Sequence, residues 1–152
     1  MSLSMLLLEA IDLETLIAEI YRLAAELAPD ENMTRELTLL SGEELGHASL
    51  LRSARNYQLG APEAFGEASL SKEDLLKGLK SAQELLARIE KKQLLLSQVL
   101  ERLMELEGQF EKAHLQTLVE IHDVSLKKLF ERLAGEDREH LKRLSRLLEL
   151  LK

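Results

Sequence analysis

Cysteine is absent from the 152 residues, which excludes disulfides, zinc knuckles, iron–sulfur clusters and thiol nucleophiles. Turn-forming residues are few, with two prolines and seven glycines, and aromatic residues make up only 3% of the chain. Leucine, alanine, glutamate, lysine and arginine dominate instead, a composition typical of long helices. At this length we expect a single domain over residues 1–152, large enough to bury a proper core.

The chain also lacks an excess of basic residues, because 27 acidic residues outnumber 20 basic ones and leave a net charge of −7. Nucleic acids and anionic membrane surfaces bind clustered lysine and arginine, so neither is an expected partner. No apolar run approaches the roughly 20 residues of a membrane span. The apolar stretch at residues 5–8 has no basic flank and meets acidic residues at once, unlike a signal peptide. We therefore expect a cytoplasmic location.

Apolar residues recur at helical spacing in four long segments, at about residues 3–28, 30–56, 93–121 and 123–151. Pro29 ends the first segment, and Asp30 is placed to cap the second. Residues 57–70 are expected to form a connection. A further helix is predicted over residues 72–90, with Ser71 and Asp74 in the pattern of a capping box. The helical pattern continues almost without interruption into the segment from residue 93, so one long bent helix is the alternative.

Short turns between the first and second segments, and between the third and fourth, make each pair an antiparallel hairpin. The roughly 35 residues between the two hairpins are enough to travel the length of a bundle. The sequence thus predicts an all-α fold, a ferritin-like four-helix bundle. Its two antiparallel hairpins would be joined by a long crossover that contains an additional helix.

A set of polar residues occurs twice in these helices, 93 positions apart. The pairs are Glu14 with Glu107, Glu44 with Asp137, and His47 with His140. Residues 13–47 align with residues 106–140 without a gap, and seven of the 35 pairs are identical. All six polar residues fall where the apolar stripe of a helix should carry leucine or alanine. The repeat predicts a pseudo-twofold bundle in which each half supplies one glutamate and one carboxylate-x-x-histidine motif.

This pattern indicates metal binding. Residues at positions i and i+3 project from the same face of a helix, so Glu44 and His47 point together into the core. Ionised carboxylates in a dry interior cost several kcal/mol each unless they are neutralised, and no lysine or arginine lies on the four stripes. Two divalent cations would balance four carboxylates, and neutral imidazoles would complete their coordination. Mixed oxygen and nitrogen ligands suit iron or manganese.

The arrangement resembles the ferritin-like di-iron carboxylate proteins, and most closely rubrerythrin-like and bacterioferritin-like chains. Glu14 with Tyr21 seven residues later is similar to their first-helix pattern, and residues 129–140 are similar to their fourth-helix signature. We expect Tyr21 to be a core residue or a hydrogen-bonding neighbour of the ligands rather than a catalytic radical site. The resemblance implies a site for two iron ions, with manganese or another divalent metal as the alternative. The metal ligands that it implies are Glu14, Glu44, His47, Glu107, Asp137 and His140. It also implies that a non-haem di-iron centre reduces peroxide or oxidises ferrous iron with dioxygen, an oxidoreductase of peroxidase or ferroxidase type.

Two positions depart from the family pattern. Asp137 stands where the family has glutamate, so it either chelates one ion without bridging or weakens the second site. His114 holds the repeat position of Tyr21 and is an extra ligand, a proton donor, a hydrogen-bonding neighbour of the ligands or a core histidine. The four-cysteine iron module of a full rubrerythrin is absent, so electrons would come from an external donor.

The sequence leaves two other functions open. The chain could instead store or handle iron, or it could be a bundle scaffold with a vestigial metal site. Glu43 and Glu136 lie one position off the stripes and are not predicted as ligands. The apolar stripe of the helix at residues 72–90 packs either on the bundle or on a second copy, and we expect a homodimer.

Overall fold

A computed structural model describes residues 2–66 and 70–152, including every side chain in these ranges except those of residues 118 and 119. Within these ranges the regular secondary structure is entirely helical. The elements are α1 (Leu3–Glu26), α2 (Glu31–Gly60), the 3₁₀ helix η1 (Pro62–Phe65), α3 (Lys72–Glu90), α4 (Leu96–Glu120) and α5 (Val124–Leu150). The prediction of an all-α helical bundle is confirmed.

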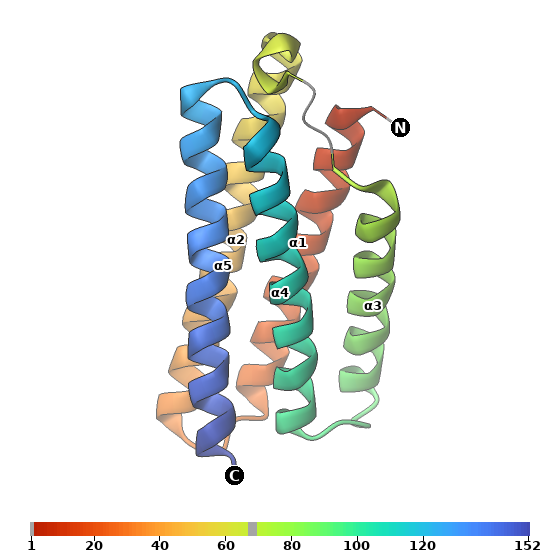
Figure 1. The fold of residues 1–152 in the computed structure, drawn as a ribbon. Helices are drawn as coiled ribbons and strands as arrows, with labels where there is room; N and C mark the ends of the chain where they lie inside the picture. Colours follow the sequence, from red (N-terminus) through yellow and green to blue (C-terminus); the bar gives the residue numbers. More distant parts are fainter. Residues whose placement is uncertain (1, 67–69) are drawn as a thin grey trace.

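Figure 1 shows α1, α2, α4 and α5 side by side, with α3 alongside α1 and α4. Helices α1 and α2 form one antiparallel hairpin, and α4 and α5 form another. Helix α3 runs back along the bundle from the end where α2 finishes, so α2 and α4 point in the same direction (Figure 1). The helix expected at residues 72–90 therefore lies within the crossover between the hairpins.

Aspartate caps fix the start of the second helix in each hairpin. The side chain of Asp30 accepts a hydrogen bond from the backbone N–H of Met33 at 2.8 Å, and Asp123 accepts one from Leu126 at 3.0 Å. Each cap satisfies a backbone donor that has no partner inside the helix. The two aspartates are equivalent positions of the sequence repeat, so both halves of the repeat cap the second helix of a hairpin in the same way.

The predicted connection at residues 57–70 is partly wrong. Helix α2 continues to Gly60, and η1 occupies part of the rest, while residues 67–69 lie outside the described residues. The physical reason for the stop is Pro62, because a proline disfavours helical backbone at the residue before it. Ala61 accordingly has φ −145° and ψ 71°, outside the helical region.

The apolar core is divided into two clusters along the bundle. The larger one contains residues such as Ile17, Leu37 and Leu100, and the smaller one contains Leu51 and Phe130. Helix α3 contributes its own apolar face to the larger cluster through Leu79, Ala82, Leu85 and Ile89. The stripe of α3 thus packs on the bundle, and the expected homodimer stays a prediction.

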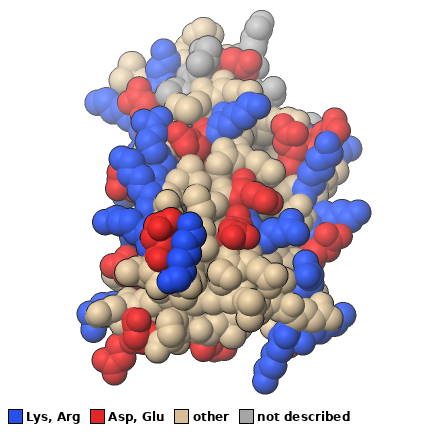
Figure 2. All heavy atoms as spheres, turned by 60° about the horizontal axis from the view of Figure 1, so that its bottom comes forward, with Lys and Arg blue, Asp and Glu red and all other residues tan. Residues whose placement is uncertain are grey.

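The face of the molecule in Figure 2 carries lysine and arginine interspersed with aspartate and glutamate. An uncharged area extends across the end of the bundle that this view brings forward (Figure 2). Three exposed leucines lie near this end: Leu27 directly after α1, Leu95 directly before α4, and Leu150 at the end of α5. Among the described helices, none combines the length and the apolarity that crossing a lipid bilayer requires.

Replacing either capping aspartate by alanine should lower the free energy of unfolding by about 1 kcal/mol, because a helical N–H loses its acceptor. Urea unfolding of metal-free Asp30→Ala and Asp123→Ala measures this. Asp12→Ala, an exposed change inside α1, is the matched control and should have little effect. Two cap variants as stable as the control would contradict the assigned capping role.

Candidate metal centre

All six residues predicted as metal ligands lie in one polar layer inside the bundle. Each of the four long helices contributes to it, and no side chain in the set is more than 1% exposed. Helix α1 provides Glu14, α2 provides Glu44 and His47, α4 provides Glu107, and α5 provides Asp137 and His140. The layer lies between the two apolar clusters, so leucine, isoleucine and phenylalanine side chains separate it from solvent at both ends of the bundle.

Three carboxylates surround one nitrogen of His47. Its Nδ1 lies 3.8 Å from Glu14 Oε2, 3.7 Å from Glu44 Oε2 and 3.8 Å from Asp137 Oδ1. An ion with octahedral ligands at about 2.1 Å sets neighbouring donor atoms roughly 3 Å apart. The observed distances are slightly longer, so small side-chain movements would bring these four groups onto one divalent cation.

A second group of donors surrounds His140. Its Nδ1 lies 2.8 Å from Glu44 Oε1 and 3.4 Å from Glu107 Oε1. Glu44 thus directs one oxygen to each histidine, and the two imidazole rings are stacked with centroids 5.0 Å apart. Tyr21 donates a hydrogen bond from its hydroxyl to Glu107 Oε1 at 3.1 Å. The carboxylate of Glu44 therefore occupies a bridging position between the two groups.

Several buried donor atoms of the layer have no hydrogen-bond partner among the described residues. They are Glu14 Oε1 and Oε2, Glu44 Oε2, His47 Nδ1 and Nε2, Glu107 Oε2, Asp137 Oδ1 and His140 Nε2. A buried polar group without a partner costs about 1–3 kcal/mol, and more when it is charged. Atoms of this kind converging from four helices fit a metal better than they fit a protein-only network. The donor set of carboxylate oxygens and imidazole nitrogens suits iron or manganese.

The electrostatics of the layer show how its negative charge is distributed. Burial, together with the negative charges of Glu107 and Glu14, raises the pKa of Glu44 well above its usual value. Burial alone would lower the pKa of His47, but the carboxylates of Glu14 and Asp137 raise it to about 9. Burial raises the pKa of Asp137 to about 6, although its bond to His114 opposes that shift. Metal-free protein therefore holds protons at Glu44 and His47, which a cation would displace.

Tyr21 and Glu14 respond differently to the same surroundings. Burial and the nearby charge of Glu107 raise the pKa of Tyr21 well above its usual value, so this phenol stays protonated. Burial would raise the pKa of Glu14, but the proximity of Glu44 and of the His47 imidazole lowers it. Glu14 therefore carries negative charge near His47, beside the protonated Glu44.

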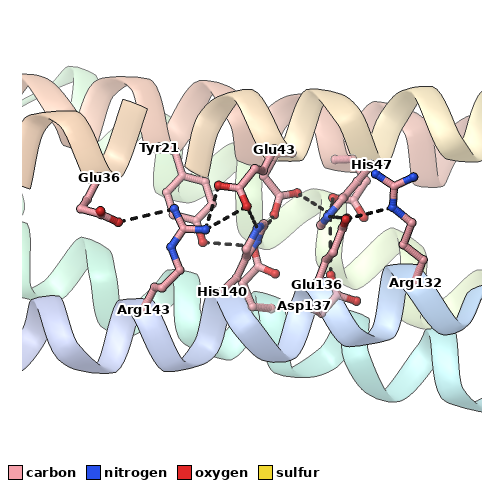
Figure 3. A network of polar contacts seen from close by, with 12 residues as sticks. Tyr21, Glu36, Glu43, His47, Arg132, Glu136, Asp137, His140 and Arg143 are labelled. Atoms are coloured by element: carbon pink, nitrogen blue, oxygen red, sulfur yellow. Dashed lines mark hydrogen bonds and ion pairs between the residues drawn. The ribbon is translucent and has the colours of Figure 1, made fainter. Parts of the chain in front are cut away.

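Two carboxylates outside the predicted ligand set contact the histidines from the bundle surface. Glu136 Oε2 lies 2.7 Å from His47 Nε2, and Glu43 Oε1 lies 3.6 Å from His140 Nε2. Neither contact has hydrogen-bond geometry. Figure 3 shows that each carboxylate also pairs with an arginine, Arg132 beside Glu136 and Arg143 beside Glu43. Neither glutamate was predicted as a ligand, because both lie at the edge of the helix interface, although Glu43 and Glu136 are an identical pair in the sequence repeat.

His114 lies next to the layer and contacts one ligand. Its Nδ1 is 2.6 Å from Asp137 Oδ2, a buried hydrogen bond. The rings of Phe110 and Phe130 pack against the imidazole, with centroid distances of 5.7 and 6.0 Å. Of the roles that the sequence left open for His114, the structure shows a hydrogen-bonding partner of Asp137.

A separate cavity lies between α1, α3 and α4. It measures about 380 Å³, and its lining includes Leu13, Leu106, Phe110 and Thr117. None of the six candidate ligands lines it. The polar layer is thus enclosed by protein, which suits an ion or a very small molecule.

Comparison with protein-family models, with curated proteins and with solved structures gave no match to this chain.

The metal-free protein should lose stability between about pH 6.5 and pH 9. The pKa of His47 rises from 6.5 to about 9 on folding, so its stabilisation is complete below pH 6.5 and is lost as the pH rises through 9. The raised pKa of Glu44 acts in the same direction, whereas the lowered pKa of Glu14 matters only in more acidic solution. The loss should reach up to about 3 kcal/mol in chelator-treated protein, measured by urea unfolding.

His47→Gln should flatten this pH dependence. The exposed histidine variant His122→Gln is the matched control and should keep the wild-type slope. A wild-type protein whose metal-free stability is constant or increases over this window would show that the layer is not protonated as described.

Proposed function

We propose that this chain is a ferritin-like, rubrerythrin-like protein that binds two metal ions, iron by preference, and acts as an oxidoreductase on peroxide or dioxygen. The observation that carries the proposal is the convergence of buried, unpartnered carboxylate and imidazole atoms from four helices. Two residue groups whose ligand atoms lie within 4.8 Å of one another support it further, Glu14 with His47 and Asp137, and Glu44 with His47 and His140.

The residues divide into roles by position. Glu14 and Glu107 would each bind one ion from the first helix of a hairpin, and Glu44 would bridge the two. His47 and His140 would each present Nδ1 to an ion, because that nitrogen faces the carboxylates in both cases. Glu136 and Glu43 lie against the opposite nitrogen of these rings and would favour the tautomer that leaves Nδ1 free.

Two ferrous ions held by these residues would supply the two electrons that reduce peroxide or dioxygen, and carboxylate ligands would tolerate the change in metal charge. The chain provides the surroundings for that chemistry. Apolar clusters on both sides of the layer exclude bulk water from the ligands. The hydroxyl of Tyr21 holds Glu107 Oε1 by a hydrogen bond and orients that carboxylate. Return to the ferrous state would require an external electron donor, since the chain has no cysteine-based iron module.

A scaffold with a vestigial metal site is the second candidate, and one contact favours it. The hydrogen bond from His114 occupies Asp137 Oδ2, so this aspartate has one fewer free oxygen for a metal. Iron storage has no such specific support, because it depends on a hollow assembly of many copies.

Anaerobic protein should bind about two ferrous ions per chain. Binding should raise the melting temperature, and the rise should become larger as the concentration of free ferrous ion increases. One equivalent of hydrogen peroxide should then oxidise both ions, since each peroxide takes up two electrons and two protons to give two waters. Calorimetry gives the stoichiometry, and absorbance of the ferric product follows the oxidation. Glu44→Gln should lose most of this binding, whereas the exposed Glu139→Gln in α5 should keep it. Protein that excludes iron under these conditions would refute the proposal.

The double variant Glu44→Leu/His47→Leu separates the metalloprotein from the scaffold. Replacing buried ionisable groups by leucine should raise the stability of metal-free protein, by about 1–4 kcal/mol if the side chains pack well. It should also abolish metal-induced stabilisation. Urea unfolding with chelator and with added ferrous ion measures both effects. A double variant that keeps wild-type metal binding would contradict the assigned ligands and leave the scaffold as the better account.

A further inference from the structure

The carboxylates of the two carboxylate-x-x-histidine motifs, Glu44 and Asp137, are placed differently. Glu44 directs Oε1 to His140 at 2.8 Å and Oε2 to His47 at 3.7 Å, so it spans both groups of donors. Its repeat equivalent, Asp137, directs Oδ1 to His47 at 3.8 Å and Oδ2 to His114 at 2.6 Å. Among the described side chains, no nitrogen of His140 lies within 4.0 Å of an Asp137 oxygen.

His114 holds Asp137 in this orientation. Phe110 stacks on its imidazole and Phe130 meets the ring in a T-shaped contact, and both contacts favour the ring orientation in which Nδ1 faces Asp137. The side chain of Asp137 is also one methylene shorter than that of Glu44, which reduces its reach toward the His140 group while it is bonded to His114. The oxygen that would complete a symmetric bridge is therefore bonded within the protein.

The two groups of donors consequently differ in number. Around His47 lie three carboxylates, from Glu14, Glu44 and Asp137. Around His140 lie two carboxylates, from Glu44 and Glu107. One oxygen of Glu107 also accepts the hydrogen bond of Tyr21, which further reduces what this group offers to a cation. Affinity for a divalent cation increases with the number of charged ligands.

We propose that the two metal positions are unequal, and that His114 makes them so by holding Asp137 on the His47 side. This inference rests on the proposed function. The position formed by Glu14, Glu44, His47 and Asp137 fills first and tightly, while the position formed by Glu44, Glu107 and His140 fills second and weakly. His114 is a positioning residue that acts through Asp137 and contacts no metal.

Cobalt(II) binding to metal-free protein tests the inference without any turnover, because the visible spectrum and calorimetry report each bound ion. Wild-type protein should bind one ion tightly and a second at least about tenfold more weakly. His114→Phe should tighten the second step by roughly tenfold, because Asp137 Oδ2 is released, and should leave the first step unchanged. His114→Asn keeps an N–H near the position of Nδ1 and should retain the wild-type separation of the two steps.

Two further variants assign the steps and do not depend on how well His114→Phe folds. Glu107→Gln should remove the weak step alone, whereas Glu14→Gln should weaken the tight step. The exposed variant His122→Phe should behave like wild type in both steps.

Three results would overturn the inference while leaving the proposed function in place. They are equal affinity of the two ions in wild-type protein, an unchanged second step in folded His114→Phe, and loss of the first ion in His114→Phe, which would make His114 a ligand. Failure of wild-type protein to bind cobalt(II) in a fixed ratio would instead refute the proposed function itself.

Discussion

The structure depends on placing ionisable groups where water does not reach them. Four carboxylates and two imidazoles lie inside an apolar bundle, each at most 1% exposed. Hydrogen bonds within the layer satisfy only part of this set, because atoms such as Glu14 Oε1 and Asp137 Oδ1 have no partner among the described residues. A fold that keeps such a layer destabilises its own metal-free state, and bound cations would remove that penalty.

Caps and apolar packing position this layer within the bundle. Aspartate caps at Asp30 and Asp123 start α2 and α5 at equivalent points of the repeat, and this sets the register of the two carboxylate-x-x-histidine motifs. Apolar clusters above and below the layer then fix the rotamers of its side chains. The pseudo-twofold relation is broken at Asp137 and His114, and the consequences of that break are local to the layer.

Much of the fold followed from residue spacing. Helix α3 begins and ends where the sequence predicted, because Ser71 caps one end and the turn at Lys92, with φ 56°, closes the other. The convergence of the six polar residues was predictable because each falls on an apolar stripe. The contact between Glu136 and His47 was not, since a residue one position off a stripe reaches inward only through its side-chain rotamer. The hydrogen bond between His114 and Asp137 likewise depends on packing against Phe110 and Phe130, which spacing does not encode.

The central claim is that these six side chains jointly hold divalent metal. Anomalous diffraction at the iron absorption edge, from crystals of protein loaded with ferrous ion without oxygen, tests it most directly. We expect anomalous peaks inside the polar layer, with the stronger peak among Glu14, Glu44, His47 and Asp137. Peaks confined to carboxylates on the outer surface, or none at all, would contradict it.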